Sequence, residues 1–290
     1  MLAVMGQLRA VLCTRRGWRL ISTNFAIAFA ALSGLTQLII AVRPVPLLQG
    51  SRVIVAISAI AAIWAFLQSV PRREFSREFA HPKFRVTVKV GDLFSEGGDL
   101  IVGFTDVFDT TTNGGDIISP RSVQGQLLSN VFGGDEGSLD GALEAALRNH
   151  QVSFVESEEM KPRGKRKRYP IGTVAVLVRQ SVKYYCVAYS RMGNNLAAQS
   201  SVTNLWNCLG GTWRAMAEHG HLNPVAIPVL GSDLARVDNL DHESLIKMII
   251  LSFVARSREG VVSRELTVVV HPDNAEYVNF NEVRAFLYSL

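Results

Sequence analysis

The chain has 290 residues, of which 48% are hydrophobic, and it carries a formal net charge of +5 at pH 7. A chain of this length has room for about two domains. Its three cysteines, Cys13, Cys186 and Cys208, are odd in number and lack the spacing of a zinc site or disulfide framework. They therefore exclude a disulfide scaffold and fit a reducing compartment.

Two apolar segments, 20–42 and 53–70, precede a remainder in which no comparable segment recurs. As helices they would measure roughly 34 and 27 Å, against a bilayer hydrocarbon core of about 30 Å. Neither contains an ionised side chain, which would be costly at mid-bilayer. We predict a hairpin of two transmembrane helices. A cleaved signal peptide fits less well, because the first segment is longer than a signal-peptide core and a second follows it.

Lysine and arginine are distributed unevenly around this hairpin. Four arginines precede the first segment and four basic residues follow the second, whereas only Arg43 and Arg52 lie between the segments. Because lysine and arginine favour the cytoplasmic side, we predict that both termini are cytoplasmic. Residues 1–19 would then be a cytoplasmic N-terminal segment, and 71–82 a charged linker to the rest of the chain.

From residue 83 onward the pattern changes to strands alternating with helices. Alternating or β-branched apolar runs predict strands at 84–90, 100–104, 172–178, 184–189, 225–230 and 266–270. Apolar residues at helical spacing predict helices at 138–149, 197–219, 241–258 and 273–288. We therefore predict an α/β domain over 83–290, with a mixed or largely parallel sheet flanked by helices on both faces.

Residues 156–168 form the one charge-dense segment of this domain. The segment begins with acidic residues and has no interleaved aromatic residues, which argues against a nucleic-acid interface. We predict a solvated, mobile hairpin tip and no nucleic-acid partner.

Sheets of this type bind ligands beyond the carboxyl ends of their strands. Three predicted strand ends carry glycine, hydroxyl or carboxylate groups, at 91–93, 105–110 and 231–236. In the last loop, backbone N–H groups could turn inward to bind an anion, and Arg236 could bind a phosphate or carboxylate. The same residue types also suit ordinary turns and helix caps, so both interpretations stay open.

Individual acidic residues in these loops have two possible roles. Asp92 could accept a hydrogen bond from the amine of an adenine, or it could form an Asx-turn. Asp106 and Asp109 could form a carboxylate pair for acid–base chemistry, although turn capping explains them as well. The chain has no Walker loop, no GxGxxG and no nucleophile elbow, and His219 and His221 lack an evident carboxylate partner. We therefore predict no metal site and no cofactor.

Taken together, the strand-end sequences resemble those of macro domains, the ADP-ribose-binding fold. The chain contains Val-Lys-Val-Gly-Asp-Leu at 88–93, Asp-Leu-Ile-Val at 99–102, Ile-Gly-Thr-Val-Ala-Val at 171–176 and Ile-Pro-Val-Leu-Gly-Ser-Asp-Leu-Ala-Arg at 227–236. Three further blocks are Phe-Asp-Thr at 108–110, Ser-Val-Gln-Gly-Gln at 122–126 and Tyr-Pro-Ile-Gly-Thr at 169–173. With two membrane helices in front, the chain resembles the macro-domain effectors of type II Thoeris anti-phage defence.

The resemblance implies a sensor located in the bacterial inner membrane as a multi-pass protein. A partner TIR-domain enzyme would convert NAD into an ADP-ribose-like signal nucleotide, which the macro domain would bind. The membrane helices would then disrupt the lipid bilayer and kill the infected cell. Two helices per chain cannot enclose a conduit, so we expect a homo-oligomer.

The resemblance also implies a set of ligand-binding residues. Asp92, with Leu93 beside it, would hold the adenine. The loop of Gly231, Ser232, Asp233, Leu234, Ala235 and Arg236 would wrap the diphosphate. The distal ribose and its substituent would be surrounded by Thr105, Asp106, Phe108, Asp109, Thr110, Ser122, Gln124 and Gly125.

The chain departs from ADP-ribosyl hydrolases of the same fold at one place. Where they carry Asn-Ala-Ala-Asn and a glycine triplet, this chain has Gly-Phe-Thr-Asp at 103–106 and lacks the triplet. The departure favours binding without catalysis. The alternative is a membrane-tethered hydrolase that processes ADP-ribose.

Overall fold

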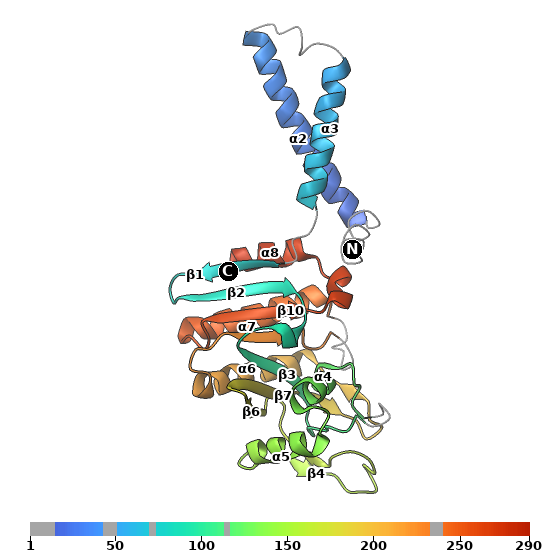
Figure 1. Ribbon diagram of the computed structural model, residues 1–290, viewed down its shortest axis with the longest axis vertical. Coiled ribbons are helices and arrows are strands. Elements are labelled where there is room, and N and C mark those ends of the chain that lie inside the picture. The colour runs from blue at the N-terminus through green and yellow to red at the C-terminus, as the bar shows by residue number, and fades with distance from the viewer. Residues whose placement is uncertain (1–14, 43–50, 70–73, 113–116, 233–239) are drawn as a thin grey trace. The chain divides into compact units, whose positions relative to one another are not determined.

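The computed structural model of the protein describes residues 15–42, 51–69, 74–112, 117–232 and 240–290. The chain divides into two compact units, Met1–Arg72 and Arg73–Leu290. The first unit contains helices α2 (Arg15–Val42) and α3 (Ser51–Ser69), and the second contains the sheet domain (Figure 1).

Helices α2 and α3 pack along each other, and their buried side chains are small. Ala28 of α2 is buried, as are Ala61 and Ala65 of α3. Large apolar side chains are exposed instead: Leu38 is 66% exposed and Ile63 is 62% exposed. Small residues at the contact and large apolar residues outside it are typical of helices in a lipid environment.

By length and composition, Ile21–Val42 is the one helix of the described residues that could cross a membrane. Ser51–Phe66 is a shorter apolar helix, because the polar residues Gln68 and Ser69 end the apolar stretch of α3. The prediction of a two-helix transmembrane hairpin is therefore confirmed only in part: the first helix is long enough, and the second falls short.

The sheet domain is built around one mixed sheet with the strand order β1-β2-β10-β9-β3-β7-β6 (Figure 1). The strands are β1 (Glu74–Phe79), β2 (Phe84–Val90), β3 (Asp99–Thr105), β6 (Val174–Arg179), β7 (Val182–Met192), β9 (Val225–Pro228) and β10 (Glu265–Val270), and a short strand, β8 (Ala198–Gln199), pairs with β7. The five central strands run parallel, whereas β1 and β6 run antiparallel to their neighbours. The predicted mixed sheet is therefore confirmed.

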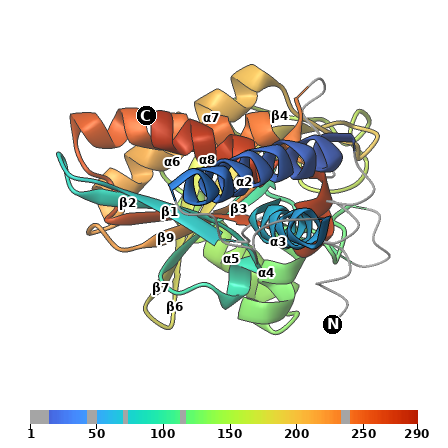
Figure 2. The same ribbon diagram turned by 90° about the horizontal axis from the view of Figure 1, so that it is seen from above.

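Helices cover both faces of this sheet (Figure 2). One face packs against α6 (Val202–His219), α7 (His242–Glu259) and α8 (Phe280–Ser289), and the other packs against α4 (Val123–Phe132) and α5 (Glu136–Leu147). Because side chains alternate along a strand, β3 contributes to both cores. Ile101 belongs to the first core, and Val102 and Phe104 belong to the second.

The predicted linker at 71–82 needs correction, because residues 74–79 form the edge strand β1. Phe75 and Phe79 are buried in the core, and all six residues of the strand pair with β2. Charged residues between these two phenylalanines obscure the strand pattern in the sequence. The sheet domain therefore begins before the predicted residue 83.

The predicted helix at 273–288 is interrupted. It consists of a 3₁₀ helix, η4 (Pro272–Tyr277), followed by α8. Asn279 causes the break, because its side chain caps α8 and its backbone N–H donates to Glu243 at 2.7 Å. A second start signal of this kind inside a helical pattern favours two short helices over one long helix.

Candidate functional site

The parallel strands β2, β3 and β9 end at one edge of the sheet, and the predicted loops follow them there. The 3₁₀ helix η2 (Leu93–Ser95), which follows Asp92 directly, contacts β9. β9 in turn pairs with β3, so residues 91–93, 105–110 and 231–232 share this edge. The remaining predicted residues of the last loop, Asp233, Leu234, Ala235 and Arg236, lie outside the described residues.

Asp92 is exposed and caps η2. One carboxylate oxygen accepts the Phe94 N–H at 3.2 Å, and the other accepts the Ser95 hydroxyl at 2.9 Å. This is the turn-capping role that its sequence context allows. Leu93 is buried in the core beneath it. The pair thus anchors the loop after β2, and adenine binding by Asp92 stays a prediction.

Asp106 is buried, and both of its carboxylate oxygens have partners. One oxygen accepts Arg168 Nη1 at 2.8 Å, and the other accepts the Met192 N–H at 2.9 Å. Arg168 also donates to Glu156 at 2.7 Å. Burial disfavours the charged guanidinium, but the hydrogen bonds to the two carboxylates outweigh this effect and raise the pKa of Arg168. Asp106 therefore anchors its loop to β7.

Asp109 is also buried, and it has different partners. Its carboxylate accepts the backbone N–H of Lys165 and lies 3.5 Å from Nζ of Lys161, whose side chain is fully buried. Burial raises the pKa of Asp109, and the neighbouring N–H and cations offset the increase only in part. Asp106 and Asp109 thus bind separate basic groups and do not form a pair with each other.

The charge-dense segment 156–168 lies at the tip of a β-hairpin, and most of its side chains are exposed, so the prediction of a solvated hairpin tip is confirmed in part; two of its charged side chains, however, are buried. Its ends are anchored by the strands β4 (Phe154–Val155) and β5 (Lys167–Arg168), which pair with each other. Lys161 is 1% exposed and Arg168 is 7% exposed. Buried charges are stable only when they are paired, and the two aspartates of the β3 loop provide the partners.

Phe108 turns the loop between these two aspartates. Its φ is 52°, a left-handed conformation that costs a residue other than glycine about 1–2 kcal/mol. The buried ring packs against Phe104 and Tyr169, with centroids 5.6 Å away in both cases. Beyond it, the hydroxyl of Thr110 donates to Asp140 of α5. Aromatic packing therefore maintains a strained turn, a feature that is common at functional loops.

Ser122, Gln124 and Gly125 lie at the start of α4, a helix absent from the predicted elements. Ser122 caps this helix, accepting the Gly125 N–H at 3.1 Å. Gln124 donates to the carbonyl of Asp109 and so joins α4 to the loop after β3. Gly125 has no room for a side chain, because an added Cβ would lie 2.4 Å from the Ser119 carbonyl oxygen. The structure thus brings these predicted residues together with 105–110.

Gly231 and Ser232 follow β9 at the same edge. Gly231 is buried with a φ of 81°, a conformation that glycine adopts without strain. The Ser232 hydroxyl donates to the carbonyl of Val229 at 2.7 Å. These two residues therefore form a tight turn whose shape depends on the glycine.

Two buried hydroxyl groups at this edge lack hydrogen-bond partners among the described residues. They are Oγ1 of Thr105 and Oγ of Ser190, which are register partners at the ends of β3 and β7. Thr105 is a predicted site residue, whereas Ser190 is not. The signal for Ser190 was its position as a polar residue directly after the apolar run 184–189. Unsatisfied buried hydroxyls of this kind indicate a place for a ligand or water.

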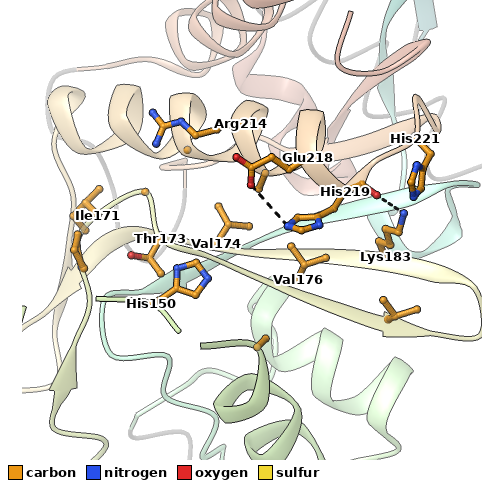
Figure 3. Close-up of a pocket in the computed structure, with 16 residues that line it drawn as sticks. His150, Ile171, Thr173, Val174, Val176, Lys183, Arg214, Glu218, His219 and His221 are labelled. Atoms are coloured by element: carbon orange, nitrogen blue, oxygen red, sulfur yellow. Dashed lines mark hydrogen bonds and ion pairs between the residues drawn. The ribbon is translucent and has the colours of Figure 1, made fainter. Parts of the chain in front are cut away.

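A cavity of about 870 Å³ lies elsewhere, along β6 and α6 (Figure 3). None of the predicted site residues lines it, so it is distinct from the strand-end loops. His219 and His221 line this cavity, and within the described residues no three His, Cys, Asp or Glu side chains are grouped to hold a metal ion.

Comparisons with known proteins place this geometry in a family context. The family model described as Thoeris protein ThsA, Macro domain, matches residues 86–271. The Thoeris protein ThsA of Bacillus amyloliquefaciens (strain Y2) is 23% identical over 208 residues, which cover 69% of this chain and 67% of that protein.

Two solved structures of the Oceanobacillus iheyensis macrodomain are also similar. The one with MES bound has a TM-score of 0.46 and 13% identity, covering 74% of this chain and 98% of that chain. The one with ADP has a TM-score of 0.42 and 12% identity, covering 75% of this chain and 99% of that chain.

Proposed function

The chain belongs to the macro-domain family of Thoeris ThsA proteins, and we propose that it is a nucleotide-gated effector of the cell membrane. In this proposal the sheet domain binds an ADP-ribose-derived signal made from NAD by a partner TIR-domain enzyme. Binding then switches the N-terminal helices to a state that disrupts the bacterial inner membrane. The infected cell dies, and the phage does not spread.

The observation that carries the proposal is the convergence of the predicted binding loops on one sheet edge. The turn at Gly231, the glycine-containing start of α4 and the left-handed turn at Phe108 in the loop after β3 lie together at this edge, next to a helix N-terminus, which suits a diphosphate. The hydroxyls of Thr105 and Ser190, which have no hydrogen-bond partner among the described residues, add hydrogen-bonding groups of the type a ribose requires. These features support a site for a sugar nucleotide.

The arrangement of charges favours binding over hydrolysis. Both buried carboxylates of the β3 loop are engaged by basic groups of the segment 156–168. A general base needs a carboxylate that can reach a substrate water: both oxygens of Asp106 accept hydrogen bonds from the protein, and Asp109 accepts one and forms an ion pair with Lys161. The family departure at 103–106 points in the same direction.

The membrane half of the proposal depends on α2, which is long and apolar enough to span a bilayer. Moving a two-state equilibrium from 1:99 to 99:1 requires about 5.5 kcal/mol of differential ligand affinity. Hydrogen bonds to charged groups contribute roughly 1.5–3 kcal/mol each, so about two to four state-specific bonds to a diphosphate would suffice. Several chains acting together as a homo-oligomer would each need less.

Replacing Gly231 tests the binding half. In Gly231→Val, a β-branched side chain must adopt a φ of 81° at a buried turn, so we expect ADP-ribose affinity to fall at least a hundredfold, about 2.8 kcal/mol. Isothermal titration calorimetry on the full chain in detergent measures this. Gly210→Ala on α6 is the matched control, because an added Cβ there meets no atom within 4 Å. Unchanged affinity in Gly231→Val would rule out this turn as the binding loop.

Liposome leakage tests the effector half. Vesicles containing the full chain should release dye when they receive the products of a TIR-domain enzyme acting on NAD, and should stay intact with NAD alone. Leakage without the products, or none with them, would contradict gating by a nucleotide.

One observation favours the hydrolase alternative: Asp109 is a buried carboxyl whose pKa burial raises, as is common for a general acid. Release of ADP-ribose from modified protein, lost in Asp109→Asn, would support that function. Absence of turnover together with tight ADP-ribose binding would support the effector.

A further inference from the structure

The strand β6 leaves one edge of the sheet open. β6 is the last strand in the sheet order, and a two-residue turn at Gln180 and Ser181, both with positive φ, joins it to β7. In such a hairpin the residues flanking the turn form a hydrogen-bonded pair, and every second residue repeats the pattern. The alternate residues, Val174, Val176 and Val178, therefore direct their N–H and C=O groups away from β7.

Further bonds in the ladder agree with this assignment. The Ala188 N–H donates to the Thr173 carbonyl at 2.9 Å, which places the odd-numbered residues of β6 on the paired side. No other strand of the described residues pairs with the outer side of β6. Proteins normally block such an edge, because it accepts additional strands.

The open edge borders the cavity of about 870 Å³, so that an added strand would find a groove beside it (Figure 3). Valines form its floor, and Val178 is 63% exposed. Lys183 and Arg214 give the walls positive charge, and Glu218 is the single carboxylate among the lining residues. The groove thus suits an extended segment with apolar and acidic side chains.

The same chain carries apolar and acidic side chains at 152–160, where the short strand β4 is followed by a turn in which the Lys161 N–H donates to the Ser157 carbonyl at 3.0 Å. Phe154 and Val155 in β4 are 52% and 61% exposed, and Met160 is 63% exposed. Glu158 and Glu159 lie beside them; the Glu158 side chain is 81% exposed and forms a surface ion pair with Arg166 at 3.0 Å. Within the described residues β4 pairs with β5 alone, which leaves its other edge available.

We propose that segment 152–160 of one copy adds to the open edge of β6 in a second copy. Main-chain hydrogen bonds would join the strands, valines would cover the apolar side chains, and the glutamates would face Lys183 and Arg214. A symmetric contact between two β6 edges is disfavoured, since it would bring like charges together. Because the contact joins two different sets of residues, it either closes a dimer when two copies exchange it reciprocally or repeats from copy to copy as a ring or a filament. This contact would be the interface of the homo-oligomer in the proposed function. It rests on the proposed function only in that respect.

Cross-linking of mixed single-cysteine variants tests the contact. In a Cys13→Ser background, full chains carrying Val155→Cys and Val178→Cys are mixed in detergent with a short bismaleimide, with and without ADP-ribose. Cys186 and Cys208 stay unreactive, because both are buried and burial raises the pKa of each thiol. We expect a covalent dimer from the mixture in at least one condition. No dimer in either condition, or equal dimer from Val178→Cys alone, would overturn the proposal.

Charge exchange gives a second measurement with an internal folding control. Glu158→Lys with Glu159→Lys, placed in the Val155→Cys chain, should reduce the cross-linked yield at least fivefold. Lys183→Glu with Arg214→Glu in the Val178→Cys chain should do the same. Mixing the two reversed chains should restore the yield, and failure to restore it would overturn the pairing. ADP-ribose binding by these variants, measured separately, reports on the nucleotide site and so distinguishes failure of that site from failure of the contact.

Discussion

The N-terminal helix pair and the sheet domain distribute apolar side chains in opposite ways. In the pair, alanines such as Ala28 and Ala61 are buried, while Leu38 and Ile63 are more than half exposed. In the sheet domain the large apolar side chains are inside, and even charged groups are buried where they have partners. The distribution in the first unit is typical of helices in a lipid environment, and that in the second is typical of a domain that folds around an apolar core in water.

The largest expected difference is between truncating a buried apolar side chain of the sheet domain and truncating an exposed one of the N-terminal helix pair. Phe253 is fully buried, with ring centroids 5.7 Å from Phe84 and 5.3 Å from Trp213. Phe253→Ala should lower the free energy of unfolding of the sheet domain by about 3–5 kcal/mol. Ile63→Ala, which removes an exposed side chain, should change it by less than about 0.5 kcal/mol. Urea unfolding in detergent, followed by circular dichroism, measures both, and equal losses would erase the distinction between the units.

A smaller effect is expected from the buried charges of the sheet domain. Arg168→Met leaves Asp106 and Glu156 without their cation and should cost about 3 kcal/mol of unfolding free energy. The matched control is Arg166→Met, which breaks an exposed pair with Glu158 and should cost about 0.5 kcal/mol or less. The same urea titration separates the two variants. If Arg168→Met were as mild as its control, the segment 156–168 would not depend on its buried pairs.

The smallest effect is a change of stability with pH. Burial raises the pKa of Asp109 above its usual 3.8 against the opposing effect of Lys161 and Lys165, so the proton is bound more tightly in the folded state. Stability from this group is therefore complete below 3.8 and is lost as pH rises through the raised pKa. The difference between the unfolding free energy of the wild-type chain and that of Asp109→Asn should therefore decrease as the pH rises from 3.8 to neutrality. A difference that rises with pH would mean that Lys161 dominates over burial.

Patterns that are local in the sequence predicted the fold well. The strand at 84–90 has the predicted bounds, because apolar and polar side chains alternate along it without interruption. The strands predicted at 172–178 and 184–189 are present as β6 and β7, which pair with each other across a tight turn. The edge strand β1 was missed because charged residues fall between its two buried phenylalanines.

Predictions for the candidate site were less complete, because its partners are distant in sequence. Asp106 and Arg168 are 62 positions apart, and nothing near either residue predicts the ion pair that buries both. Polar residue types placed 105–110 at a strand end correctly, but they did not distinguish a ligand group from a structural anchor. Position within the sheet was therefore predictable, whereas the bonding state of each side chain was not.

The strand β1, which follows the N-terminal unit along the chain, is attached to the last helix of the domain. Arg77 donates to the carbonyl of Leu287 at 2.8 Å, and the Tyr288 hydroxyl donates to the carbonyl of Ser76 at 2.8 Å. Tension applied at Glu74 would therefore load the β1–β2 ladder and α8 simultaneously. The first strand and the last helix of the domain would resist this tension together. A substitution that loosens α8 would therefore lower the force needed to detach β1 from the domain.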